Sequence, residues 1–185
     1  MNTTQTVTKT KWNLDMKHSE IQFKAKHLMI STVTGTFRTF EADMETMEDD
    51  FCTAEIKFSA DINSISTGNE ERDGHLKSAD FFNAEKFPKL NFASTSIEKK
   101  DESNFILNGN ITLLDVTKPV SFNVEFGGIA KDPWGMTRAG FTLAGKINRK
   151  DFGLNWNVLT EAGGLLVSEE IKLSASIQFV KVQLN

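Results

Sequence analysis

Apolar and polar residues alternate along most of this chain of 185 residues. In the clearest run, every second residue from Cys52 to Ile62 is apolar, and the residues between them are polar. Successive side chains of a β-strand point to opposite faces of a sheet, so this pattern predicts a strand with one buried face. Cys52 belongs to the apolar set and is therefore expected to be buried.

The same alternation recurs in several other segments, namely residues 21–26, 105–113, 120–126, 141–148 and 171–179, with shorter runs near Trp12, Phe37 and Phe92. Together these segments predict roughly eight or nine strands. Residues 48–50 have the composition of a solvated turn, and residues 131–135 and 161–164 that of hairpin connections. Strands with one apolar face need a shared interior, which an antiparallel sandwich or a closed barrel provides. The sequence therefore predicts an all-β fold.

Two segments interrupt the alternation. The longer one, residues 65–88, contains many of the polar residues that could carry chemistry, and within it residues 69–82 are typical of a short helix that Gly74 weakens. The shorter one, residues 26–30, is interpreted as a further helical turn that closes one end of the sheet. We find no repeat or linker, and expect one domain over residues 11–185 after a loose lead-in at residues 1–10.

Composition narrows the classes of function. The hydrophobic content of 39% is that of an ordinary soluble domain, and the net charge of −4 is spread along the chain, which argues against nucleic-acid binding. The single cysteine cannot form an internal disulfide. The first residues lack the apolar core of a signal peptide, and no later stretch could span a bilayer. A cytoplasmic location is expected, or a periplasmic one if a leader was removed.

Candidate catalytic and metal-binding residues do not form convincing sets. Asp15, His18 and Ser19 include the residue types of a hydrolase triad, but adjacent residues of an extended segment point to opposite faces, so His18 cannot serve Ser19. His18, His27 and His75 are scattered and lack metal-ligand spacing, with or without Asp73. We therefore expect no catalytic residue, no metal and no required cofactor.

A series of short motifs resembles a known family over nearly the whole chain. The motifs are Trp12-x-x-Asp15-x-x-His18-Ser19, Lys26-His27, Val33-x-Gly35-x-Phe37, Thr67-Gly68-Asn69, Arg72-Asp73-x-His75-Leu76, Asp80-Phe81-Phe82, Phe87-Pro88, Gly109-x-Ile111-Thr112, Val116-Thr117-Lys118-Pro119-Val120 and Arg149-x-Asp151-Phe152-Gly153. In this order and spacing the chain resembles the YceI-like family of lipocalin-like, polyisoprenoid-binding proteins. It departs from the family at Asp115, where a glycine is frequent.

The resemblance implies a lipocalin-like antiparallel eight-stranded β-barrel with one or two short helical insertions, often assembled as a homodimer. It implies a noncatalytic carrier whose ligand is a long-chain amphiphile such as a polyisoprenoid, an isoprenoid quinone or a fatty-acid-like lipid. Alternation alone favours a solid core, because it marks an interior without showing that the interior is hollow. Two alternatives stay open: an enzyme acting on a lipid, with His18 and His75 as general bases, and a solid barrel that binds a protein partner.

The predicted ligand site has two parts. The apolar interior that would hold the tail consists of strand residues, namely Phe23, Phe37, Ile56, Phe58, Phe92, Phe122, Phe126, Phe141 and Leu143. The head group or a lid is expected at residues of the irregular segments, namely His18, Arg72, His75, Phe81 and Phe82. The purely structural interpretation of residues 65–88 is that Asn69 caps a helix, Arg72 and Asp73 form local ion pairs, and the phenylalanines anchor the segment.

Overall fold

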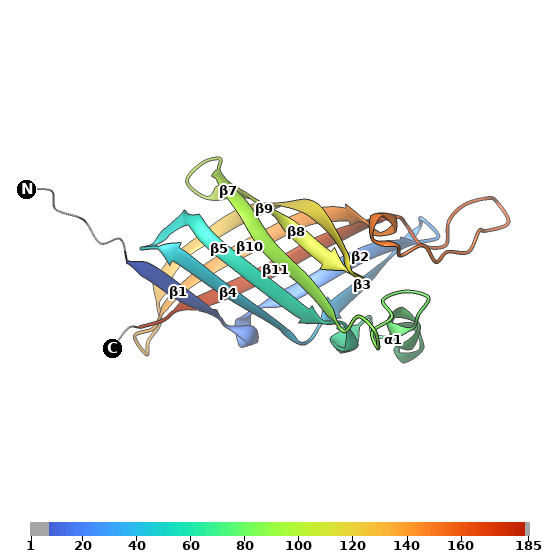
Figure 1. Ribbon diagram of the computed structural model, residues 1–185, viewed down its shortest axis with the longest axis horizontal. Helices are drawn as coiled ribbons and strands as arrows, with labels where there is room; N and C mark the ends of the chain where they lie inside the picture. The colour runs from blue at the N-terminus through green and yellow to red at the C-terminus, as the bar shows by residue number, and fades with distance from the viewer. Residues whose placement is uncertain (1–7, 184–185) are drawn as a thin grey trace, which may run out of the picture.

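Antiparallel pairing of successive strands closes the sheet into a barrel in the computed structural model, which describes residues 8–183 (Figure 1). The segments are β1 (Lys9–Leu14), β2 (Glu20–His27), β3 (Ser31–Phe37), β4 (Phe40–Met47), β5 (Asp50–Asp61), β6 (Ile65–Ser66), β7 (Lys89–Lys99), β8 (Asn104–Leu113), β9 (Val116–Lys131), β10 (Thr137–Asn148) and β11 (Glu170–Lys181). The ring runs β1-β4-β5-β7-β8-β9-β10-β11, and β1 pairs with β11 to close it.

Three of the barrel strands are each broken into two segments. The 3-10 turn η1 (Met16–His18) separates β1 from β2, a two-residue break separates β3 from β4, and η2 (Ile62–Ser64) separates β5 from β6. β2 continues along β11 where β1 leaves it, and β3 and β6 follow β2 in the sheet. The molecule is thus an eight-stranded antiparallel barrel, and the predicted fold class is confirmed.

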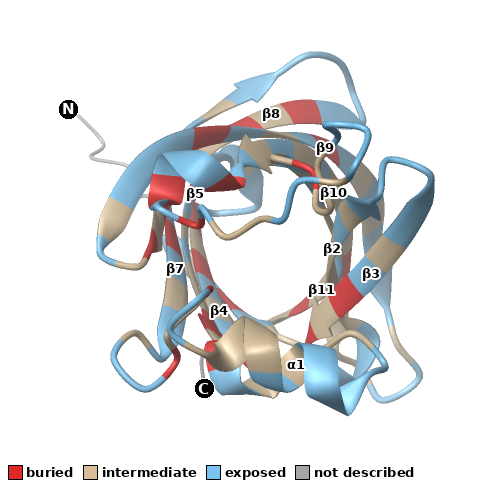
Figure 2. Cartoon of the chain, turned by 90° about the vertical axis from the view of Figure 1, so that its right-hand side faces the viewer, coloured by how far each residue is buried: buried red, intermediate tan, exposed pale blue. Residues whose placement is uncertain are grey.

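The connections at the two ends of the barrel differ in length. One end, called the α1 end here, has two tight turns and two long excursions, residues 62–88 with helix α1 (Glu70–Lys77) and residues 149–169 with η3 (Arg149–Phe152). Figure 2 looks onto this end and shows α1 lying across its rim. The opposite end has only short connections, among them the turn at 132–136 between β9 and β10.

The predicted helix within residues 69–82 is confirmed, because α1 begins after Asn69, whose side chain accepts a hydrogen bond from the Arg72 amide at 2.9 Å. The helical turn predicted at residues 26–30 is wrong. Leu28 and Met29 have φ angles of 52° and 60°, so the chain makes a tight turn between β2 and β3 instead. Residues 161–164 do form a turn, but it lies at the tip of the 149–169 excursion rather than between two barrel strands.

The prediction that Cys52 is buried is also wrong, since Cys52 is exposed and Phe51 points into the barrel. The pairing between β4 and β5 changes register between Glu45–Glu55 and Met47–Asp50, which leaves β5 with more residues than β4. Such a bulge reverses the alternation locally. At the start of the chain, β1 begins at Lys9, within the predicted lead-in; residues 1–7 of that lead-in lie outside the described residues.

Candidate ligand-binding cavity

A cavity of about 180 Å³ lies inside the barrel. Gln22 and Ser174 are the only polar residues in its lining. They pair with each other across β2 and β11, next to Phe23 and Leu173, which point inward, so their own side chains point outward. The surface presented to a ligand is therefore apolar, and it carries no titratable side chain among the described residues.

Burial along the strands shows that the interior is hollow. Trp12, Ala60 and Ile62 are almost completely buried, and they lie toward the ends of the barrel. Phe58, Phe122 and other inward-facing residues midway along the strands are only half-buried, and they line the cavity. A residue that faces inward yet keeps accessible surface must face an empty space. Residues of both packed clusters, the larger one and the one around Trp12, line the cavity.

Most residues predicted for the apolar interior line this cavity. Eight of the nine do so, namely Phe23, Phe37, Ile56, Phe58, Phe92, Phe122, Phe141 and Leu143. Phe126 also lies inside the barrel but does not line the cavity, because it packs against Phe51 and Phe141 with ring centroids 5.1 and 5.3 Å apart. That these residues bind a ligand stays a prediction.

Sequence reasoning missed three further aromatic residues of the lining: Phe51, Phe105 and Phe179. Phe105 and Phe179 follow the alternation of their strands and could have been assigned from it. Phe51 could not, because the bulge in β5 hides its orientation.

Three inward-facing glycines set the width of the cavity. A Cβ atom on Gly35 would lie 2.1 Å from Phe23 Cζ, and one on Gly145 would lie 2.7 Å from Phe122 Cδ1. At Gly109 the corresponding distance to the ring of Phe92 is 2.4 Å. Each ring thus lies over a glycine of the neighbouring strand, where no side chain pushes it away from the wall. The glycines therefore let large rings line the barrel without filling it.

Helix α1 is joined to the 149–169 excursion by aromatic contacts. The His75 ring lies edge-on to Trp156 at 4.8 Å and to Phe81 at 5.1 Å, and its Nε2 lies 2.9 Å from Asp80 Oδ2. Phe81, which is buried, and Phe82 and Trp156, which are half-buried, pack against the same cluster as the cavity wall. These contacts place His75, Phe81 and Phe82 together over the α1 end; that they form a lid stays a prediction.

Arg72 is held by local contacts rather than aimed at the cavity. It donates from Nε to the Thr67 hydroxyl at 2.7 Å and from Nη2 to the Thr67 carbonyl at 2.9 Å. Asp73 accepts from the Thr67 amide and hydroxyl, so hydrogen bonds to Thr67 take the place of the local ion pairs expected of Arg72 and Asp73. Neither residue lines the cavity. A head-group role for Arg72 stays a prediction.

Arg149 organises the second excursion, a role that sequence reasoning missed. Its buried guanidinium donates to the carbonyls of Ser168 at 2.8 Å, Leu154 at 2.5 Å and Trp156 at 2.9 Å, with a longer contact to Val167 at 3.3 Å. Burial lowers the pKa of Arg149 from its ordinary value, and the charge of Glu169 opposes this shift. Arg149 thereby fixes the base of the excursion that carries Trp156.

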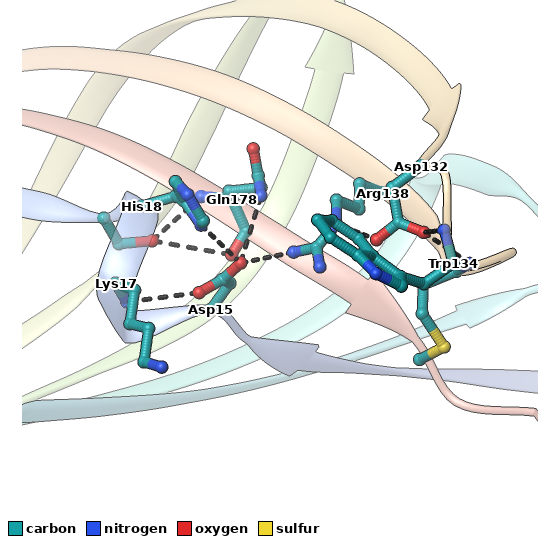
Figure 3. A network of polar contacts seen from close by, with 9 residues as sticks. Asp15, Lys17, His18, Asp132, Trp134, Arg138 and Gln178 are labelled. Atoms are coloured by element: carbon teal, nitrogen blue, oxygen red, sulfur yellow. Dashed lines mark hydrogen bonds and ion pairs between the residues drawn. The ribbon is translucent and has the colours of Figure 1, made fainter.

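His18 lies apart from His75, Phe81 and Phe82, in a polar network on the wall of the barrel (Figure 3). The Asp15 carboxylate accepts from His18 Nδ1 at 2.8 Å and from Gln178 Nε2 at 3.1 Å, and it forms an ion pair with Arg138. Arg138 also binds Asp132 in the turn between β9 and β10 at 2.7 Å. The turn η1 holds His18 where β1 and β2 separate, and a head-group role for His18 stays a prediction.

The network lowers the pKa of Asp15 below its ordinary value. Burial is the largest single effect and acts in the opposite direction, but it is outweighed by hydrogen bonds from His18, the Lys17 amide and Gln178 and by the charge of His18 when protonated. The pKa of Arg138 is raised, chiefly by its hydrogen bond to Asp132. Ionised Asp15 and Arg138 therefore link the end of β1 to the turn between β9 and β10.

Residues 8–183 contain no group of three side chains suited to binding a metal ion, so the structure does not bring His18, His27 and His75 together. Within the same residues, no helix has the length and apolar character needed to cross a membrane.

Comparison with known proteins places this barrel in a family. The YceI-like domain matches residues 12–179. A UPF0312 protein of Staphylococcus epidermidis is 38% identical over 171 residues, which cover 92% of this chain and 97% of the relative. A UPF0312 protein of Staphylococcus aureus is 37% identical with the same coverage.

Solved structures share the fold. The Campylobacter jejuni YceI protein is 31% identical with a TM-score of 0.74, covering 85% of this chain and 90% of its own. Burkholderia cenocepacia BcnA has a TM-score of 0.75 at 18% identity, covering 89% and 98% of the two chains. A polyisoprenoid binding domain from Saccharophagus degradans has a TM-score of 0.68 at 13% identity, covering 91% and 97%. The sequence match and the shared barrel together show that this chain belongs to the YceI-like family.

Proposed function

We propose that this protein is a noncatalytic carrier that holds the tail of a long-chain amphiphile inside the barrel, with a polyisoprenoid or an isoprenoid quinone as the favoured ligand and a fatty-acid-like lipid as a further candidate. The observation that carries the proposal is the central cavity, whose inward-facing side chains are all apolar. An alkyl or prenyl tail has no hydrogen bonds to satisfy, so such a wall suits it. The family and the polyisoprenoid binding domain of the same fold support this ligand class.

The arrangement of the titratable groups favours binding over catalysis. General acid–base chemistry needs a proton donor or acceptor within hydrogen-bond reach of the reacting atom. The two histidines considered as bases lie elsewhere, His18 beside Asp15 on the barrel wall and His75 beside Asp80 above the α1 end. A tail held in the cavity would meet neither of them.

Tail burial supplies the affinity in this account. Each buried methylene contributes about 0.8 kcal/mol, which corresponds to about a fourfold gain in affinity. The cavity of about 180 Å³ is smaller than the roughly 300–1,000 Å³ of common small-molecule pockets. A long tail must therefore displace inner rings or the cluster beneath the lid. Affinity is expected to rise with tail length and then level off.

Replacing two alanines by phenylalanine, one inside the barrel and one outside, tests this proposal. Ala175 lines the cavity on β11, whereas Ala144 is exposed on the outer face of β10. Ala175→Phe fills the space and is expected to weaken binding of a prenylated quinone at least tenfold, while Ala144→Phe binds as wild type does. Binding is measured by native mass spectrometry in a mild detergent, and circular dichroism checks the fold. Equal binding by both variants would contradict a ligand in the cavity.

The expected homodimer and cytoplasmic location belong to the same proposal. A carrier without a membrane-spanning helix in its described residues would exchange its ligand by contact with membranes or proteins. Sedimentation of the purified protein measures the oligomeric state, and fractionation of cells measures the compartment.

A further inference from the structure

The exposed apolar residues of the α1 end form one projecting tip. Ile30 is 83% exposed and Leu159 is 71% exposed, and Leu28, Met29 and Val158 are exposed beside them in sequence. We call these five residues the apolar tip. They come from two segments far apart in the chain, the turn between β2 and β3 and the 149–169 excursion, which extend side by side beyond the barrel in Figure 1.

Hydrogen bonds hold the two segments of the apolar tip together. The Leu28 amide donates to the Leu166 carbonyl at 2.9 Å, and the Ser168 amide donates to the Lys26 carbonyl at 3.0 Å. His27 and Val167 form a further antiparallel bridge. The tip is therefore a built feature in which exposed apolar side chains are presented on a supported backbone.

A row of lysines lies on the outer face of the barrel behind the tip. Lys146, Lys172 and Lys24 are direct neighbours across β10, β11 and β2. Lys146 pairs with Glu170, whereas Lys24 and Lys172 have no ion-pair partner within residues 8–183. Like charges directly opposite one another in a sheet are destabilising, so the row suits an external anionic partner.

Lys26 continues this row toward the tip. It is exposed and precedes Leu28 by two residues, which is about 7 Å along a strand. Glu161, at the turn within the excursion, is the acidic residue nearest in sequence to Leu159, and its negative charge partly offsets the positive charge of the lysines. Apolar side chains that project beside basic ones are the combination by which peripheral proteins bind anionic bilayers.

We propose that the apolar tip inserts into the surface of an anionic lipid bilayer, with the lysine row against its headgroups. The inference rests on the proposed function for its purpose, because a carrier of a water-insoluble lipid must collect it from a membrane. One residue separates Val158 of the tip from Trp156, which contacts His75 of the lid. Docking thus brings the lid end of the barrel to the lipid.

Charge argues against a second copy of this chain as the occupant. A symmetric contact between two tips would bring two lysine rows near each other, and like charges across an interface are unfavourable. An anionic bilayer complements both the apolar tip and the lysines.

Vesicle cosedimentation tests the proposal with the full chain. The probes are phosphatidylcholine vesicles with and without phosphatidylglycerol. The double variant Ile30→Ser with Leu159→Ser, called the tip variant, is expected to lower the partition coefficient at least tenfold for both kinds of vesicle. Lys24→Gln with Lys172→Gln is expected to lose most of the preference for phosphatidylglycerol. Trp134→Ser is the matched control, because Trp134 is also 83% exposed but lies at the opposite end, and it should bind as wild type does.

Three outcomes overturn the proposal: unchanged binding by the tip variant, loss of binding by Trp134→Ser instead, or conversion of a dimer into a monomer by the tip variant without vesicles. The substituted side chains are exposed, so folding should be retained, which circular dichroism checks. The tip variant should still bind a prenylated quinone supplied in detergent. If wild type binds the quinone but not the vesicles, docking fails while the carrier function stands. If wild type binds the vesicles but not the quinone, the carrier function fails while docking stands.

Discussion

At the scale of single residues, alternation along the strands found most of the cavity wall. Phe58 and Phe122 follow the pattern and line the cavity as expected. Phe51 also lines the cavity but breaks the pattern, because a bulge in β5 turns Phe51 inward and Cys52 outward. Bulges depend on pairing with a neighbouring strand, so one strand read alone does not reveal them.

Close approach of a ring to a glycine leads to the first prediction. A methyl group on Gly145 would meet Phe122 Cδ1 at 2.7 Å, so Gly145→Ala is expected to lower the free energy of unfolding by about 1–3 kcal/mol. Gly140, on the same strand, has nothing within 4 Å of such a group, so Gly140→Ala is the control. Urea unfolding measures both. Equal stability of the two variants would show that Phe122 does not depend on the glycine.

Ionised Asp15 leads to the second prediction. Its pKa is lowered by folding, so the folded protein binds this proton more weakly than the unfolded chain. The resulting stability is fully present above the unfolded pKa of about 3.9 and is lost as the pH falls through the folded pKa. Asp15→Asn is expected to cost about 1–3 kcal/mol at neutral pH, because a charged hydrogen-bond acceptor is removed.

The difference between wild type and Asp15→Asn should therefore begin to shrink as the pH falls below the unfolded pKa of about 3.9, and it should be smallest below the lowered folded pKa, where both side chains are neutral. Urea unfolding across the pH range measures this. Asp43→Asn is the control, because Asp43 is exposed and has no ion-pair partner in the described part of the chain. A pH-independent difference would contradict the account of Asp15.

At the scale of elements, the strands were predictable and several connections were not. Alternation marks a strand through its own residues, and the capped helix α1 carries its start signal at Asn69. The sequence wrongly predicts a helical turn at Leu28 and Met29, because both residues adopt left-handed conformations that are uncommon for leucine and methionine. The 149–169 excursion depends on Arg149, whose partners are backbone carbonyls and leave no trace in the sequence.

Removing the guanidinium of Arg149 leads to the third prediction. Arg149→Met leaves buried carbonyls without a hydrogen-bond donor, and each such group costs about 1–3 kcal/mol. The free energy of unfolding is therefore expected to fall by at least about 2 kcal/mol. Amide exchange measured by mass spectrometry should speed up at residues 154–168 and stay slow in β8 and β9. Arg38→Met is the control, because Arg38 is exposed and its side chain donates to Ser66. Unchanged exchange at residues 154–168 would contradict this role.

At the scale of the whole molecule, the barrel followed from the number and polarity of the strands, but its hollowness did not. Alternation marks which face is inside and says nothing about whether that inside is filled. The structure shows that the interior is hollow, because inward-facing rings at the middle of the strands are only half-buried and glycines lie opposite Phe23, Phe92 and Phe122. The segment at residues 65–88 places His75 and Phe81 against Trp156 of the second excursion.

The most direct test of the central claim is native mass spectrometry of the gently purified protein, followed by organic extraction and by addition of an isoprenoid quinone. We predict a lipid-sized mass increment that is released by extraction, identified as a long-chain amphiphile and restored by the added quinone. A protein that carries no lipid and takes up no quinone, while folded and otherwise intact, would contradict the account.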